Sequence, residues 1–166
     1  MAVDAPDLPG PVPAGLWRRC MSAVYESIVL FGVVVFFGYG FSALVRFQGV
    51  PGPMRWAFQG FLLAVLGAYF VWFWSLGRRT LPMKTVGLRL VDARGGPVGR
   101  GRAAVRFAVA AAGLILPFAA WKHVGPAGLL LFPVPIAWAA FDPQRRALYD
   151  VVAGTRLVVD PGPPRR

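Results

Sequence analysis

The residues best placed to do chemistry are the charged ones that interrupt apolar stretches. Glu26 is the only charged residue between Met21 and Val45, a stretch long enough to cross a bilayer as a helix. A carboxylate at such a depth is costly unless it faces protein or water and has a partner. Glu26 is therefore the first candidate for a functional or structural role.

Two interpretations of Glu26 follow. In the first, the carboxylate binds a proton and a cation in turn, and Glu26 is a site of ion or proton exchange. In the second, Glu26 is a charge lock that pairs near the interface with an arginine from the 77–102 loop or the C-terminal tail. We favour the lock, because Glu26 is near the end of its span and no second acidic residue accompanies it.

Three further candidates lie near the ends of the sequence. Arg18 and Arg19 directly precede the first apolar block, where they can anchor its topology. A guanidinium group also binds a carboxylate in a bidentate fashion. We therefore predict that Arg18 or Arg19 contacts Glu26 or Asp150, although Asp150 could instead form a local helical pair with Arg146.

The sequence contains no recognisable catalytic set. Its single histidine, His123, and single cysteine, Cys20, cannot form a conventional zinc site. There is no Gly-rich phosphate loop and no nucleophile elbow. We expect a protein that is not an enzyme and that holds no metal or cofactor.

The apolar blocks predict an all-α membrane protein, a bundle of about four transmembrane helices. Of the 166 residues 57% are hydrophobic, and four blocks approach the length of a bilayer span. These blocks are 21–45, 56–76, 103–121 and 125–141. The last is short and contains Pro133 and Pro135, so a re-entrant or interfacial segment is the alternative. Arg106, near the start of the third block, is expected to reach the interface by snorkelling.

A small β element is predicted beside the helices. Residues 86–92 alternate in part like a strand, and 93–97 form a turn. Residues 155–159 are a second strand that could pair with Leu88–Val91, after a short helix that Gly154 ends. One unit over 16–159 is expected, flanked by a Pro-rich flexible tail at 1–15 and a short C-terminal tail at 160–166.

The basic residues are distributed unevenly about the spans. Of the 18 lysines and arginines, all but Arg46, Arg55 and Lys122 lie beside the termini or the long middle loop. The positive-inside rule then places both termini and this loop in the cytoplasm. The net charge of +11 does not indicate nucleic-acid binding, because the charges between apolar blocks leave little room for an exposed basic face.

Lipids are the expected partners of this basic surface. Lys84 and Arg89 in the middle loop should meet anionic headgroups, at about 1 kcal/mol per residue near the membrane surface. Four short helices enclose little volume, so a transport path would need more than one chain. A homo-oligomer is the corresponding expectation.

Three ordered segments of the chain resemble the RDD family of bacterial membrane proteins. The family takes its name from an arginine and two aspartates, which correspond here to Arg18 or Arg19, Glu26 and Asp150. The segments that carry the resemblance are Leu16-Trp17-Arg18-Arg19 leading to Tyr25-Glu26, Thr80–Thr85 with Leu88–Asp92, and Arg145–Thr155.

The resemblance implies a bacterial inner-membrane location and a transport-related role. Some members of the family are reported as sodium/proton antiporters. This sequence departs from the family pattern at Glu26, which replaces an aspartate, and at Pro82, where glycine is frequent. Tyr149 stands where histidine is common, which removes a group that could titrate near neutral pH. The alternative function is a scaffold or accessory subunit that binds anionic lipid or a protein partner.

Overall fold

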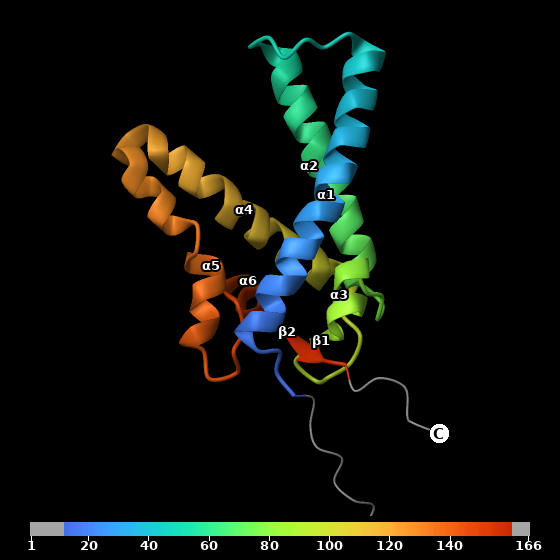
Figure 1. Cartoon of the computed structure of the whole chain (residues 1–166), viewed down its shortest axis with the longest axis vertical. Helices are drawn as coiled ribbons and strands as arrows, with labels where there is room; N and C mark the ends of the chain where they lie inside the picture. The colour runs from blue at the N-terminus through green and yellow to red at the C-terminus, as the bar shows by residue number, and fades with distance from the viewer. Residues whose placement is uncertain (1–11, 161–166) are drawn as a thin grey trace, which may run out of the picture.

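The computed structural model describes residues 12–160, which form a mostly helical protein with a small sheet at one end (Figure 1). The predicted tails at 1–15 and 160–166 lie largely outside these residues. The elements in order are α1 (Leu16–Val45), α2 (Pro53–Trp74), α3 (Leu81–Val86), β1 (Leu88–Asp92), α4 (Arg100–Val124), η1 (Gly125–Leu131), α5 (Val134–Ala137), η2 (Trp138–Ala140), α6 (Leu148–Ala153) and β2 (Thr155–Val159).

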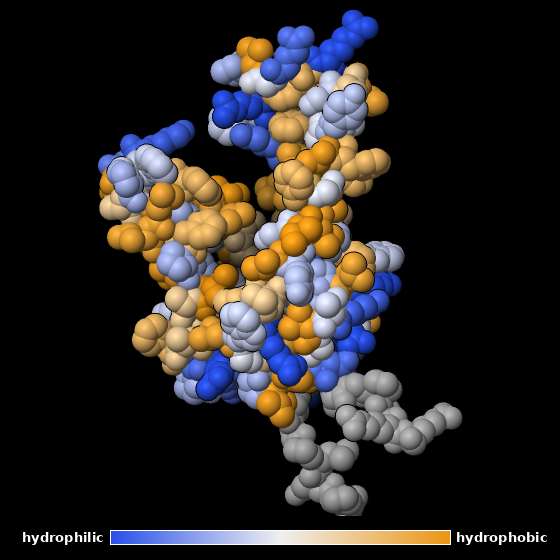
Figure 2. Space-filling view, in the orientation of Figure 1, coloured by the Kyte–Doolittle hydropathy of each residue, from blue (hydrophilic) through white to orange (hydrophobic). Residues whose placement is uncertain are grey.

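Three helical segments within residues 12–160 are long and apolar enough to cross a membrane. They are Leu16–Val45, Pro53–Trp74 and Arg100–Ala140. Few of their residues are buried inside the protein, and their apolar side chains form much of the orange surface across the middle of Figure 2. The predicted class of helical membrane protein is therefore confirmed.

The segment predicted as a fourth span is not one continuous helix. It consists of the 3-10 helices η1 and η2 and the short α5 between them. Pro133 and Pro135 provide no backbone N–H and disturb the preceding turn, which explains the break. The chain reverses after α4, and η1 packs so tightly on it that a Cβ atom at Gly128 would lie 2.7 Å from the backbone nitrogen of Trp121.

The sheet pairs the two predicted strands. β1 and β2 are antiparallel, with Leu88 opposite Val159 and Asp92 opposite Thr155, and Gly154 ends α6 with a φ of 63°. Both predictions are confirmed.

The end of the predicted N-terminal tail joins this sheet. The backbone N–H of Ala14 donates to the carbonyl of Leu157 (2.9 Å), and that of Val159 donates to Val12 (2.9 Å). Pro13, between them, has no backbone N–H, which an edge position of a sheet tolerates. The prediction of a free tail is therefore wrong for residues 12–14, because their prolines exclude a helix but not an extended edge segment.

The sheet brings both ends of the described chain together. Residues 12–14 and β2 lie side by side, while the α1–α2 turn lies at the opposite end of the molecule (Figure 1). The main cluster of buried apolar side chains is also here, and comprises Ala14, Trp74, Met83, Leu88, Leu90, Val98, Ala103 and Leu157. We call this part of the molecule the sheet end.

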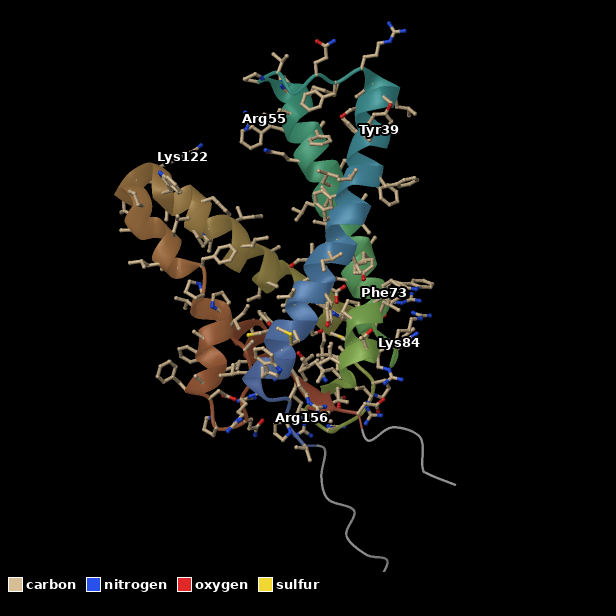
Figure 3. All side chains as sticks on the ribbon, in the orientation of Figure 1. Tyr39, Arg55, Phe73, Lys84, Lys122 and Arg156 are labelled. Atoms are coloured by element: carbon tan, nitrogen blue, oxygen red, sulfur yellow. The ribbon has the colours of Figure 1, made fainter. Side chains whose placement is uncertain are left out.

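The basic side chains are also divided between the sheet end and the opposite end of the molecule. Lys84 and Arg156 lie at the sheet end, whereas Arg55 and Lys122 lie far from it (Figure 3). The charge pattern of the sequence predicted this division into a large and a small set of basic residues with the helices between them.

Candidate functional site

The buried face of α1 is polar. Its buried residues are Arg19, Ser22, Glu26 and Gly38. The first three follow one another at spacings of three and four, so they share one face of the helix. A lipid-facing helix thus turns its charged residues inward, and two polar clusters form around Arg19 and Glu26.

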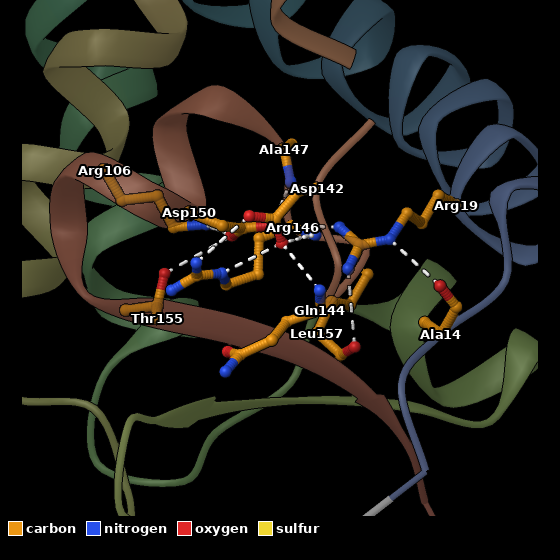
Figure 4. Close-up of polar contacts among 10 residues, drawn as sticks. All are labelled: Ala14, Arg19, Arg106, Asp142, Gln144, Arg146, Ala147, Asp150, Thr155 and Leu157. Carbon is orange, nitrogen blue, oxygen red and sulfur yellow. Dashed lines mark hydrogen bonds and ion pairs between the residues drawn. The ribbon is translucent and has the colours of Figure 1, made fainter. Parts of the chain in front are cut away.

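The first cluster is centred on Asp150, which is fully buried between two arginines (Figure 4). Arg19 Nη1 donates to its Oδ2 at 2.8 Å, and Arg106 Nε donates to its Oδ1 at 2.8 Å. The hydroxyl of Thr155 and the backbone N–H of Ala147 also donate to the carboxylate, each at 3.3 Å. Such a carboxylate has its hydrogen-bonding capacity largely filled.

The position of Asp150 in its helix explains part of this arrangement. Ala147 is the N-cap residue of α6, so Asp150 is the third residue of the helix. An acidic side chain at this place reaches back to the N-cap amide, as the acidic half of a capping box does. The local sequence therefore orients the carboxylate before the arginines bind it.

Arg19 also ties α1 to the sheet end. Its Nε donates to the carbonyl of Ala14 at 3.2 Å, and its Nη2 donates to that of Leu157 at 3.5 Å. Arg18, in contrast, is exposed. Of the two arginines that the sequence offered, Arg19 is the one that contacts Asp150.

Arg106 does not reach the interface, and the expectation that it snorkels is wrong. It is 3% exposed, because its guanidinium stacks on the rings of Trp74 at 4.1 Å and Tyr149 at 5.0 Å. Its place in an apolar block, like that of Glu26, was the signal that could have revealed a buried role.

The second cluster surrounds Glu26, which is 8% exposed. The hydroxyl of Tyr69 in α2 donates to Oε1 at 2.7 Å, and that of Thr80 donates to Oε2 at 2.7 Å. Thr80 is the N-cap residue of α3 and its hydroxyl also accepts from the backbone N–H of Met83. The start of α3 therefore fixes this hydroxyl beside α1.

The predicted pairing of Glu26 with an arginine is not found. Among residues 12–160, no lysine or arginine nitrogen lies within 4.0 Å of its carboxylate. One partner, Thr80, comes from the 77–102 loop that was expected to supply it, but the other, Tyr69, comes from α2, and both are hydroxyls. Glu26 thus has two hydroxyl partners, whereas Asp150 has two guanidinium partners.

Other charged residues lie around the rim of the sheet end. Arg146 pairs with Asp142 at 3.0 Å, not with Asp150 as the alternative prediction had it. The hydrogen bond from the Arg146 side chain lowers the pKa of Asp142 to about 2. Of the two residues predicted to meet lipid headgroups, Lys84 is exposed on α3 and Arg89 is half-buried on β1. Near Arg106, burial raises the pKa of Tyr149 above its usual value.

No group of three potential metal ligands from His, Cys, Asp and Glu comes together in the described part of the chain. The fold and the two clusters define a helical membrane protein with a charge cluster buried beneath a small sheet. The chain belongs to the RDD family, whose model matches residues 13–154. No curated protein and no solved structure matches the chain.

Proposed function

We propose that this protein exchanges ions or protons across the bacterial inner membrane and that Glu26 is the carboxylate that binds them. The observation that supports the proposal is that, within residues 12–160, the Glu26 carboxyl group has no lysine or arginine partner within 4.0 Å. It is buried among hydroxyls, whereas Asp150 has two guanidinium partners.

The chemistry of the Glu26 cluster suits a small cation or a proton. A buried carboxylate without a cationic neighbour is stabilised when it is protonated or when a cation binds it. The hydroxyls of Tyr69 and Thr80 can rotate from donating to accepting. Together with the carboxylate they would then offer a hard cation the oxygen ligands that it prefers.

The topology that we propose has four crossings, with both termini in the cytoplasm. Residues 12–14 and β2 share one end of the molecule, which favours an even number of crossings. The segment 125–141 would be the fourth, returning against α4. The sheet end carries most of the basic residues and would face the cytoplasm by the positive-inside rule. A transport path would be completed by a homo-oligomer.

Inverted membrane vesicles and a pH-sensitive dye test the proposal. The wild-type protein should dissipate an imposed pH gradient when Na⁺ or K⁺ is added. Glu26→Gln should abolish this response, because the amide carries no negative charge to bind a cation. Glu26→Asp keeps the charge on a shorter arm and should retain a reduced response.

Asp142→Asn is the matched control, since it removes a carboxylate from the rim and should leave the response unchanged. All variants are first compared by size-exclusion profile and amount in the membrane. A response of Glu26→Gln equal to that of the wild type would exclude Glu26 as the ion-binding group.

A second candidate function is a non-transporting scaffold or accessory subunit that binds anionic lipid or a protein partner. The observation that favours it is Arg78, whose guanidinium stacks 4.1 Å from the ring centroid of the exposed Trp72. Such an arginine–aromatic pair suits the headgroup region. Purification in mild detergent should then recover a stoichiometric partner or bound anionic lipid, and recovery of self-associated protein alone would contradict this function.

A further inference from the structure

The buried cluster at Asp150 carries an excess of positive charge. Two arginines, Arg19 and Arg106, meet one carboxylate, and all three side chains are buried. Within residues 12–160 neither guanidinium has a second acidic partner within 4.0 Å. An unbalanced charge away from water is costly, so a further anion at this place would stabilise the protein.

Two buried N–H donors at the same place have no acceptor. They are Nη1 of Arg106 and Nε1 of Trp74. Arg106 is 3% and Trp74 is 8% exposed, so bulk water does not satisfy them. Buried donors without acceptors are rare in native proteins, and each calls for an explanation such as an ordered water or ion.

The two donors belong to side chains that lie against each other. The guanidinium carbon of Arg106 lies 4.1 Å from the centroid of the Trp74 ring. The guanidinium and the indole group carry N–H donors and no acceptor. The two side chains therefore cannot satisfy each other, and both N–H groups remain available to a third group.

We propose that Arg106 Nη1 and Trp74 Nε1 form an oxyanion-binding site that takes a phosphate group. A water molecule could accept the hydrogen bonds but would leave the excess positive charge. A phosphate would accept the hydrogen bonds and also balance the charge. Guanidinium groups suit phosphate oxygens through charge-assisted hydrogen bonds. The site is independent of Glu26 and stands whether or not the protein exchanges ions.

The phosphate can come from solution or from a lipid headgroup. Trp74 is the last residue of α2 and Arg106 lies in the second turn of α4, so the site is near the sheet end, where the basic residues gather. Both sources share the chemistry of the bound group. The experiment distinguishes them by offering each source separately.

Thermal unfolding followed by circular dichroism provides the first test. Wild-type protein in dodecyl maltoside micelles, which carry no phosphate group, is titrated with inorganic phosphate, against sodium chloride of equal ionic strength. A saturable rise in Tm with phosphate alone identifies a free anion. A saturable rise when phosphatidylglycerol is added to the micelles, without inorganic phosphate, identifies a headgroup. The absence of both overturns the proposal.

Trp74→Phe removes the indole donor and keeps an aromatic ring for the stack. It should raise the half-saturating phosphate concentration by about tenfold or more, and reduce a lipid-dependent shift correspondingly. Trp56→Phe, an exposed position at the start of the same helix, should behave as the wild type. Equal responses of Trp74→Phe and wild type would refute the site.

A measurement on the wild-type protein avoids any folding defect of the variant. The chain has six tryptophans, and labelling with ¹⁵N resolves their indole N–H signals by NMR. One signal should shift saturably with inorganic phosphate, or with phosphatidylglycerol added to the micelles, as its hydrogen forms a new bond. If no indole signal responds to either source, the proposed site does not exist.

Discussion

Nη1 of Arg19 lies 2.8 Å from Oδ2 of Asp150, although 131 residues separate the two in the chain. The contact joins the first membrane helix to the last short helix before β2. It explains why a charged residue directly before an apolar block points inward, where topology anchoring alone would leave it at the surface.

Arg19→Lys should destabilise the protein by about 1.5–3 kcal/mol, because hydrogen bonds to a buried charge are lost and an ammonium group cannot reproduce the guanidinium fork. Arg18→Lys should change stability by less than about 0.5 kcal/mol, since Arg18 is exposed. Denaturant unfolding in detergent compares the two. Equal effects would show that Arg19 acts only as a surface charge.

Asp150→Asn should be more damaging than either arginine variant, at about 3–5 kcal/mol. The change leaves two buried guanidinium groups without a counter-charge while keeping the size of the side chain. The midpoint of thermal unfolding and the yield of monodisperse protein measure the effect. The control is Asp142→Asn at the rim, and an Asp150→Asn protein as stable as this control would contradict the charge lock.

Thr80→Val should destabilise the protein by about 1–3 kcal/mol, because the new side chain neither caps α3 nor donates to Glu26. Thr80→Ser keeps the hydroxyl and should stay close to wild type. Valine keeps the methyl group of threonine and replaces only its hydroxyl, so the difference in unfolding free energy between wild type and Thr80→Val isolates the hydroxyl. A Thr80→Val protein as stable as wild type would show that these hydrogen bonds do not stabilise the fold.

The pair of Asp142 and Arg146 should make stability depend on pH in acid. The pKa of Asp142 is lowered from 3.8 to about 2 in the folded protein, first by the side-chain hydrogen bond from Arg146. A lowered pKa stabilises the fold fully above the ordinary value and loses this contribution as pH falls towards 2. The stability difference between wild type and Asp142→Asn should be constant above about pH 5 and shrink between pH 4 and 2. A difference that stays constant down to pH 2 would rule out this linkage.

The sequence predicted those features that depend on local patterns. The apolar blocks identified α1, α2 and α4, and alternation with a terminal glycine identified β1, β2 and the end of α6. The division of basic residues predicted which charges lie at the sheet end. In each case the pattern follows directly from the period of the element or from the cost of charge in a bilayer.

The partners within the candidate site were harder to predict. Charge favours an arginine as the partner of Glu26, yet the hydroxyls of Tyr69 and Thr80 donate to it, and single hydroxyl residues carry no periodic signal. The position of Arg106 near the start of its apolar block is compatible with snorkelling to the interface. Only the tertiary arrangement brings Trp74 and Tyr149 against its guanidinium.

The position of β2 in the chain has a consequence for biosynthesis. β1 has its partner strand, and Arg19 its carboxylate, only after residues 150–159 have left the ribosome. In insertion that accompanies synthesis from the N-terminus, the hairpin of α1 and α2 enters the membrane while the Arg19 guanidinium still lacks this ion pair. A chain that stops before α6 has neither Asp150 nor β2 and cannot form these contacts.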